Sequence, residues 1–487
     1  MALDRARVGQ QPRAMQHAVG GRIARPEGPD KVAGRTRYIA DYVVPGAWFG
    51  GVVRSAVARG RLSALELDPR FDFSRVKLVT ARDIPGANVV AMLADDQPVL
   101  AEGDVRHYGE ALALVAAPDT HTLAAALAAI RPRIEPLPAL FDPRASEQVF
   151  KHIAIVKGDA RAVLARAARV IEGEYRTASQ EQMYIETQGV IAFPPDADGV
   201  LSVHGSMQCP YYVQKALMKA LGLDAQRARV VQAATGGGFG GKEDYPSVLA
   251  VQAALLARAS GRPVRMVMER HEDLAVTPKR HPSIVRHRTA VDDDGRLLAM
   301  EIDVLFDGGA YTTLSPVVLS RGCIHAAGPY RCDNVEIRGR AVATNHVPYG
   351  AFRGFGAPQT CFAMERQMDR IAHALALHPL ELRRRNMLRL GDTTATGQKL
   401  ADSVGSQAVM ERIVASTGFD RYAWRAPKRG RVRRGTGFSF FFHGAGFTGS
   451  GEELLKGTVA VELTRDGRAL VRSASTEFGQ GTLAMLS

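Results

Sequence analysis

A glycine-rich segment at 235–244, TGGGFGGKED, constrains the fold of this 487-residue chain more than any other feature. It follows the strand-like stretch 227–234 and precedes an apolar, helical pattern that starts at Ser247. Glycine permits backbone conformations that other residues avoid, and its amides can closely approach an anion or a metal-bound oxygen. The segment therefore predicts either a tight strand-to-helix turn or a loop that faces a ligand.

Two common nucleotide-binding loops are disfavoured here. A phosphate-binding P-loop needs Ser or Thr after its lysine, whereas Glu243 follows Lys242 in this chain. A dinucleotide-binding turn needs a well-placed carboxylate downstream for the ribose, and the sequence offers none.

Two further glycine segments lie at predicted element boundaries. GAFRGFGAPQ (350–359) leads into a helical pattern, and STEFGQGT (475–482) follows a predicted hairpin. Either one alone is explained by a turn. Three such segments, which carry Phe, Arg and Gln between their glycines, predict one cofactor that is approached from several loops.

The remaining pattern is that of an α+β protein, because strands and helices are mixed rather than strictly alternating. We expect an N-terminal extension at 1–19, a first domain at 20–145, and a second domain at 159–487. The polar stretch between the two domains predicts a loop-like boundary.

Within the second domain, Asp159 is a good cap for a helix over 160–171. The pattern predicts further helices over 211–223, 247–261 and 361–377, and hairpins that turn at Asp294–Gly295 and Asp466–Gly467.

Composition excludes several classes of protein. The net charge is +13, but the arginines are scattered except in KRGRVRRG (428–435), so we expect a solvated linker or a face for an acidic partner subunit rather than nucleic-acid binding. No apolar run approaches the ~20 residues of a membrane span. We expect a cytoplasmic protein without membrane contact. The four cysteines are far apart and predict neither disulfides nor an iron–sulfur or zinc site.

TGGGFGGKE, AFRGFGAPQ and TEFGQGT together resemble the cofactor-binding motifs of the molybdenum hydroxylases, the family of xanthine dehydrogenase and aldehyde oxidase. SMQCP (206–210) is similar to the family's segment with a glutamine beside the molybdenum. The stretches 20–42 and 104–117 resemble parts of its hammerhead-like domain. The resemblance runs from about Gly20 to Thr482. It implies a hammerhead-like α/β domain followed by the first half, and the start of the second half, of a molybdopterin-binding α/β domain.

The resemblance also implies a molybdenum–molybdopterin cofactor, in its mononucleotide or cytosine dinucleotide form, whose own sulfurs hold the metal. No protein metal ligand is then expected. Gln208 is expected to donate its side-chain amide to a metal oxygen, and the backbone of Gly238, Phe239 and Gly240 to lie against the same face. Arg353 is expected to line the other side, and Gln480 to bond the pterin.

Three residues match the family's substrate-binding positions. Phe355 corresponds to an aromatic that stacks on a planar substrate, although it is equally explained as a core side chain. Glu243 and Arg321 correspond to groups that hold a purine ring and its developing negative charge. A carboxylate at a helix start is also favourable in itself, and Arg321 is equally explained as an ion-pairing arginine. His325 is expected to be structural.

The sequence departs from the family at two places. The segment 446–453 has no aromatic at the position of the second substrate clamp, although Phe447 is near. The GExxxG segment that carries the family's catalytic glutamate is not found, so no residue is nominated as the base. The chain is therefore expected to be either a half-subunit that needs a second chain or a catalytically silent remnant.

The family reaction is the hydroxylation of an activated carbon with water as the oxygen source. Its substrates are purines and other N-heterocycles, aldehydes and aromatic compounds. Electrons leave the site through iron–sulfur and FAD groups, for which this chain has no motifs. The resemblance therefore implies an iron–sulfur subunit and an FAD subunit as partners, besides a small-molecule substrate.

Overall fold

The computed structural model describes residue 21 and residues 23–90, 92–421, 430–432, 435–446 and 457–486. The N-terminal extension predicted at 1–19, part of the basic run 428–435, and positions 447–453 of the predicted clamp segment lie outside the described residues.

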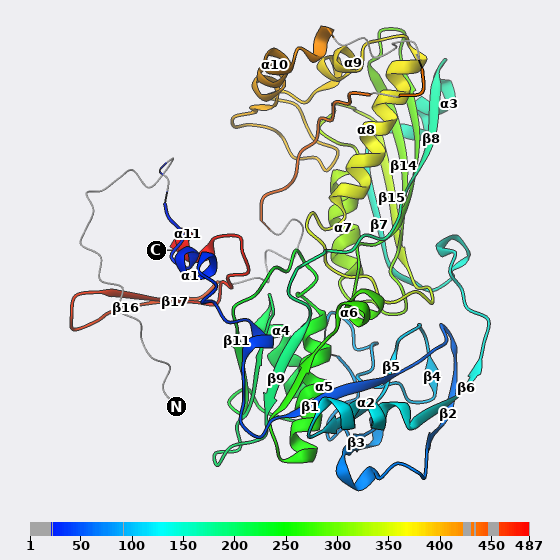
Figure 1. The fold of residues 1–487 in the computed structure, drawn as a ribbon. Helices are drawn as coiled ribbons and strands as arrows, with labels where there is room; N and C mark the ends of the chain where they lie inside the picture. The colour runs from blue at the N-terminus through cyan, green and yellow to red at the C-terminus, as the bar shows by residue number, and fades with distance from the viewer. Residues whose placement is uncertain are drawn as a thin grey trace.

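A mixed seven-stranded sheet forms the lower half of the molecule in Figure 1, with the strand order β11-β10-β9-β12-β1-β5-β3. Strand β1 (Trp48–Arg54) pairs in parallel with β12 (Val264–Val267), so the sheet draws strands from both sides of the predicted boundary. Its other strands are β3 (Lys77–Val79), β5 (Ala111–Ala117), β9 (Gly189–Phe193), β10 (Leu201–Gly205) and β11 (Ala228–Gln232).

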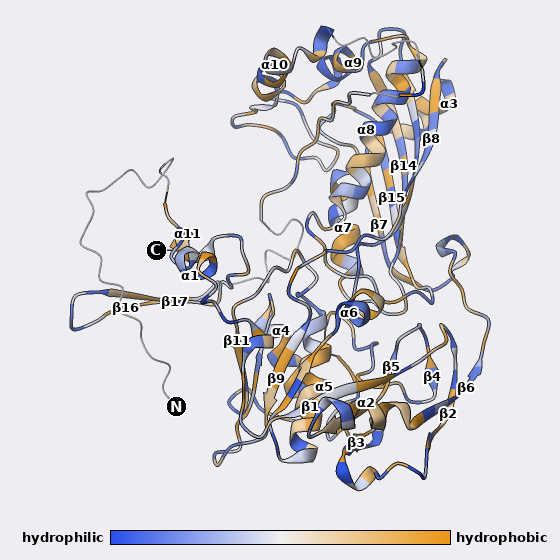
Figure 2. Ribbon diagram, in the orientation of Figure 1, coloured by the Kyte–Doolittle hydropathy of each residue, from blue (hydrophilic) through white to orange (hydrophobic). Residues whose placement is uncertain are grey.

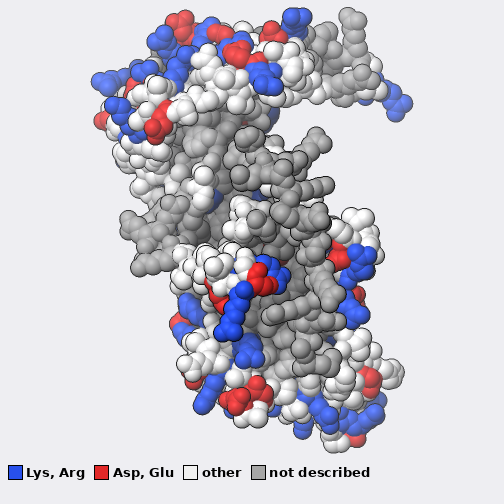
Figure 3. Space-filling view, turned by 90° about the vertical axis from the view of Figure 1, so that its left-hand side faces the viewer, with Lys and Arg blue, Asp and Glu red and all other residues white. Residues whose placement is uncertain are grey.

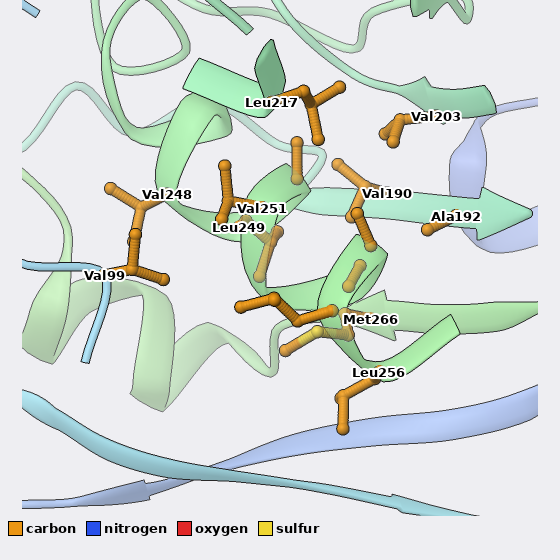
Figure 4. Packing of buried hydrophobic residues seen from close by; sticks show 14 of the residues in the cluster. Val99, Val190, Ala192, Val203, Leu217, Val248, Leu249, Val251, Leu256 and Met266 are labelled. Carbon is orange, nitrogen blue, oxygen red and sulfur yellow. The ribbon is translucent and has the colours of Figure 1, made fainter. Parts of the chain in front are cut away.

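Helices α4 (Pro210–Leu221) and α5 (Tyr245–Ser260) pack against this sheet and form the largest described core. Figure 4 shows how Leu217, Leu249 and Val251 from these helices gather beside Val190 and Met266 from the strands. Helix α5 is buried along nearly its whole length and is coloured as largely hydrophobic in Figure 2. Burial of apolar surface is the main stabilising term in such a core. This packed core is a rigid support for the loop that precedes α4 and for the loop that precedes α5.

A small three-stranded sheet lies beside the seven-stranded one, in the order β4-β2-β6. The N-terminus of helix α2 (Thr120–Ala128) is capped by Asp119, whose side chain accepts from the Thr122 N–H. The helix packs on β1 through Leu123 and Leu127. The three strands are β2 (Gly60–Leu67), β4 (Asp104–Val105) and β6 (Ile130–Pro136).

A five-stranded sheet forms the upper half, in the order β7-β15-β14-β13-β8. Helices α7 (Ser315–His325) and α8 (Ala357–Ala374) run along it, and a second core lies between these helices and the strands. Helix α3 (Ala160–Arg166) packs against β13 and β14 through Leu164. The strands are β7 (Val149–Lys157), β8 (Val170–Thr177), β13 (Ser283–Val291), β14 (Leu297–Asp307) and β15 (Val335–Val342).

The remaining elements surround these two halves. Strands β16 and β17 form a separate hairpin whose residues are exposed throughout. The bounds are α1 (Gly28–Val32), α6 (Arg270–Val276), α9 (Pro379–Asn386), α10 (Ser406–Thr417), β16 (Val459–Leu463), β17 (Ala469–Ser473) and α11 (Thr482–Leu486).

Most of the predicted elements are confirmed, and two predictions are wrong. The stretch 145–158 is not a loop, because β7 lies within it and turns Ile153 and Ile155 toward the core of the five-stranded sheet. The helix capped by Asp159 ends at Arg166 rather than at 171, because β8 already begins at Val170. Both errors concern strands at sheet edges, where only half of the side chains are apolar.

The described surface carries charges of both signs. On the face shown in Figure 3, Lys and Arg side chains are interspersed with Asp and Glu. Within the described ranges, no helix combines the length and the apolar character that crossing a membrane requires.

Candidate cofactor site

The first glycine loop (residues 235–244, loop 1) connects β11 to α5 and approaches the rest of the chain closely. Gly240 has a φ of +101°, and a Cβ built there would lie 2.7 Å from the Ala351 carbonyl carbon and from the Phe352 Cα. Phe239 has a φ of +52°, which is uncommon for any residue with a side chain. Only glycine fits at 240, so the loop meets its neighbour backbone to backbone.

The neighbour is the second glycine loop (residues 350–359, loop 2), which leads into α8. The Arg353 N–H donates to the Phe239 carbonyl at 2.8 Å. Phe355 also has a positive φ, of +48°. Strained backbone at one aromatic in each of two touching loops is typical of a functional site. Because α5 belongs to the lower half and α8 to the upper half, this contact lies where the two halves meet.

Gln208 lies just before α4, and its side chain supports loop 1 through hydrogen bonds. Its Oε1 accepts from the Gly240 N–H at 2.9 Å and from the Lys242 N–H at 3.3 Å. A Cβ at Gly238 would collide with the same oxygen, so glycine is required there as well. With its oxygen used by the loop, the amide nitrogen of Gln208 is the half of the side chain left for a ligand.

The third glycine segment (residues 475–482, loop 3) contacts the region around Gln208, although it is distant from it in the sequence. The Thr476 hydroxyl donates to the Gln208 carbonyl at 2.8 Å, and Gln232 Nε2 donates to the Glu477 carbonyl at 3.3 Å. Gln480 Nε2 donates to the Thr476 carbonyl at 2.7 Å, so in this structure its amide bonds within its own loop.

One open cavity of about 1080 Å³ lies between the three loops. It brings together seven residues that the sequence nominated, from four separate motifs. These are Gln208, Phe239, Gly240, Glu243, Arg353, Phe355 and Gln480. The convergence expected from three glycine segments is thus seen in the structure, with Gly238 directly behind Gln208.

Arg321, like Gly238, is a nominated residue that does not line this cavity. It lies on α7, largely buried, and its guanidinium donates to the Gly446 carbonyl at 2.8 Å. Its other terminal nitrogen lies 3.3 Å from His443 Nε2, and that imidazole reaches the Gly354 carbonyl. Arg321 therefore stands behind loop 2. His325 is buried, and its Nε2 accepts from the Gly444 N–H, in keeping with a structural role.

Two adjacent acidic residues stand at the end of loop 1. Burial raises the pKa of Glu243 to about 8, and the neighbouring charge of Asp244 adds to this effect. Burial also raises the pKa of Asp244 to about 6. At neutral pH the Glu243 carboxyl thus largely keeps its proton, so it can donate a hydrogen bond into the cavity as well as accept one.

A segment that sequence reasoning missed supports both glycine loops. Every second residue of QMYIETQ (182–188) is turned toward them. Gln182 Nε2 donates to the Ala351 carbonyl at 2.8 Å, and Gln188 Nε2 donates to the Gly241 carbonyl at 2.6 Å. Between them, Tyr184 packs against Gly241, and Glu186 accepts from the Gly236 N–H at 2.6 Å. The sequence signal that could have revealed this segment is its alternation, in which every second side chain is large and polar.

The donor set fits a group that brings its own metal ligands. Gln208 offers an amide N–H, and the backbone of Gly236, Gly237 and Gly240 lines the cavity. Among the described residues, no group of His, Cys, Asp and Glu side chains is arranged to hold a metal ion. All four cysteines are free thiols, and burial raises the pKa of Cys209, the one next to Gln208, above its ordinary value.

Comparison with known proteins identifies the family. Residues 141–387, half of the chain, match the molybdopterin cofactor-binding domain, and residues 412–487 match a further molybdopterin cofactor-binding domain. Residues 33–138 match the a/b hammerhead domain of aldehyde oxidase and xanthine dehydrogenase. The chain belongs to the molybdenum hydroxylase family.

Two curated relatives of this molybdenum hydroxylase chain come from bacteria. It is 36% identical over 399 residues to the nicotinate dehydrogenase large molybdopterin subunit of Eubacterium barkeri, in an alignment that covers 79% of this chain and 92% of that one. It is 33% identical over 474 residues to a probable xanthine dehydrogenase subunit of Bacillus subtilis, in an alignment that covers 95% of this chain and 63% of the relative.

The fold is also that of solved molybdenum hydroxylases. The aldehyde oxidoreductase of Desulfovibrio desulfuricans superposes with a TM-score of 0.83 at 26% identity, over 94% of this chain and 53% of that one. The enzyme of Desulfovibrio gigas gives a TM-score of 0.80 at 26% identity, over 94% and 52%. The chain therefore spans about half the length of these two oxidoreductases.

Proposed function

We propose that this chain binds the molybdenum–molybdopterin cofactor in the cavity between loops 1, 2 and 3, with the metal end facing Gln208. The observation that carries the proposal is the convergence of Gln208, Phe239, Arg353 and Gln480 on one cavity from four separate motifs. The match to molybdopterin-binding domains supports the cofactor's identity.

Each side chain then has a definite task. The Gln208 amide nitrogen would donate to the metal end of the cofactor, because the side-chain oxygen already accepts from the Gly240 N–H. Arg353 would supply a positive charge from loop 2, and Gln480, whose amide now bonds within loop 3, would turn that amide to the pterin. Preorganised donors of this kind stabilise charge without reorganisation at the moment of reaction. When bound, the cofactor supplies the two-electron oxidation of a substrate carbon, with water as the oxygen source.

We propose a planar N-heterocycle as the substrate class. Glu243 and Phe355 line the same cavity, so a hydrogen-bonding carboxyl and an aromatic side chain, which also packs against the second core, both border it. A largely protonated Glu243 can donate to a ring nitrogen or carbonyl. One relative in this family is named as a nicotinate dehydrogenase subunit, which also favours a nitrogen heterocycle over an aldehyde.

The chain is proposed to work in a complex with an iron–sulfur subunit, an FAD subunit and a chain that supplies the catalytic glutamate. The match over 92% of a relative named as a large molybdopterin subunit favours an enzyme divided among subunits. A catalytically silent remnant is the second candidate.

The test is to isolate the tagged chain from its native host with everything that co-purifies. We expect molybdenum, pterin, iron and flavin in the preparation, and dye reduction with nicotinate or xanthine exceeding that with benzaldehyde. Nucleotide released on hydrolysis distinguishes the cytosine dinucleotide from the mononucleotide form. Cofactor without turnover on any of the three substrates supports the silent remnant, and a preparation without molybdenum contradicts both candidates.

A further inference from the structure

A single carboxylate, that of Glu186, collects four hydrogen bonds from separate parts of the chain. Its Oε2 accepts from the Ser206 hydroxyl at 2.6 Å, the Gly236 N–H at 2.6 Å and Lys242 Nζ at 2.9 Å. Its Oε1 accepts from the Ile39 N–H at 3.2 Å. A carboxylate with this many donors is fixed in one position.

Its partner Lys242 depends on it. The Lys242 side chain is 0% exposed and that of Glu186 is 10% exposed. Lys242 Nζ also donates to the Ser206 hydroxyl at 2.8 Å and lies 5.0 Å from the centre of the Tyr184 ring. An ammonium buried without a counter-ion is strongly unfavourable, so Lys242 depends on the Glu186 carboxylate to stay in place.

The two bonds to loop 1 lie at its opposite ends. Gly236 opens the glycine run and Lys242 closes it, and both are tied to the same carboxylate. Between these anchors lie Gly237, Phe239 and Gly240, which have positive φ and line the cavity. Glycine has little conformational preference of its own, so the conformation of the loop depends on its anchors, among them these two.

We propose that Glu186 is a positioning residue: through the Gly236 N–H and Lys242 Nζ it sets the Phe239–Gly240 turn at the distance from Gln208 that the metal end of the cofactor requires. The role rests on the proposed function, because it concerns the cofactor cavity. Nothing in the family match assigns a task to this residue.

The chain offers a matched control. Arg383 and Glu365 form a second ion pair with the same exposed fractions, 0% and 10%, beside the five-stranded sheet, where Arg383 also lies 3.0 Å from Asp369. Neither residue lines the cofactor cavity. Glu186→Gln and Glu365→Gln therefore remove the charge from equally buried pairs, one at loop 1 and one away from it.

The experiment compares both variants with wild type in the cofactor-loaded complex. Hydrogen exchange of peptides over 235–244 reports the loop, and the Mo(V) electron paramagnetic resonance spectrum reports the surroundings of the metal. We expect Glu186→Gln to speed exchange of these peptides by about tenfold or more and to shift the Mo(V) g values. Glu365→Gln should lower Tm while leaving both loop exchange and spectrum unchanged.

Milder variants keep the test decisive if Glu186→Gln does not fold. Ser206→Ala removes one hydrogen bond from each member of the pair, so it should change loop exchange and the Mo(V) spectrum in the same direction as Glu186→Gln does. Lys242→Arg should retain the wild-type spectrum. Wild-type protein without molybdenum refutes the proposed function. The positioning role alone is refuted if the protein carries molybdenum and neither Glu186→Gln nor Ser206→Ala changes the loop exchange or the spectrum. It is also refuted if Glu365→Gln changes both readouts to the same extent.

Discussion

The side-chain oxygen of Gln208 accepts a hydrogen bond from the Gly240 N–H at 2.9 Å. This bond joins the start of α4 to the middle of loop 1, and both residues line the cavity. Because the oxygen is committed to the loop, the orientation of the amide is set before any ligand binds. The amide nitrogen is thereby left for an acceptor on the cofactor.

Replacing Gln208 by alanine is expected to lower the molybdenum content severalfold. The change removes the amide donor and leaves the Gly240 N–H without its acceptor, which costs about 1–3 kcal/mol at a buried site. Metal analysis of purified protein gives the readout. The control is Gln214→Ala on α4, since that amide donates to the Ala225 and Ala228 carbonyls and does not line the cavity. Equal molybdenum loss in both variants would contradict a special role for Gln208.

Gly240→Ala is expected to disrupt the contact between loops 1 and 2. Its Cβ would press against the backbone of Ala351 and Phe352, in addition to the strain of a positive φ. Gly261→Ala is the control, because that glycine also has a positive φ, of +64°, but no atom lies within 4 Å of its Cβ position. Positive φ alone costs roughly 1–2 kcal/mol. Thermal unfolding should show a larger loss for Gly240→Ala, and a similar loss in both would argue against tight loop packing.

Glu243 should make the stability of the cofactor-free chain depend on pH. Its pKa is raised to about 8 in the folded state, against about 4.3 in the unfolded chain. Between these values the folded chain holds a proton that the unfolded chain has lost, so stability falls as pH rises, by up to about 1.4 kcal/mol per pH unit. Above about pH 8 this contribution levels off. Glu243→Gln should flatten the profile of Tm from pH 5 to 9, and an unchanged profile would contradict the burial of this carboxyl.

Arg321→Met is expected to lower kcat/KM for xanthine and for benzaldehyde by the same factor. Arg321 bonds to Gly446 and His443 behind loop 2, so its loss would loosen the loop whatever the substrate. Steady-state kinetics of the complex provides the measurement. A loss confined to xanthine would instead show that the guanidinium reaches the substrate.

The glycine loops that border the cavity could be predicted from the sequence, for a physical reason. Glycine at 240 and at 238 is required by close backbone contacts, and such requirements are visible as glycine runs. The support from Tyr184, Glu186 and Gln188 could not be predicted in the same way. These residues contact loop 1 more than 45 positions further along the chain, and no local pattern specifies a long-range partner.

In the fold, too, features that depend on neighbouring residues could be predicted, and features that depend on distant residues could not. The cap of α3 by Asp159 and the hairpin between β13 and β14 depend on neighbouring residues, and both were predicted correctly. The parallel pairing of β1 with β12 depends on strands more than 200 residues apart. Its consequence, a sheet shared across the predicted boundary, became visible only in three dimensions.

Anomalous X-ray scattering at the molybdenum absorption edge, from crystals of the purified complex, tests the central claim most directly. We predict a peak inside the cavity between loops 1, 2 and 3, beside Gln208, Phe239 and Gly240. A peak elsewhere in the chain, or no molybdenum peak in this cavity, would contradict the account.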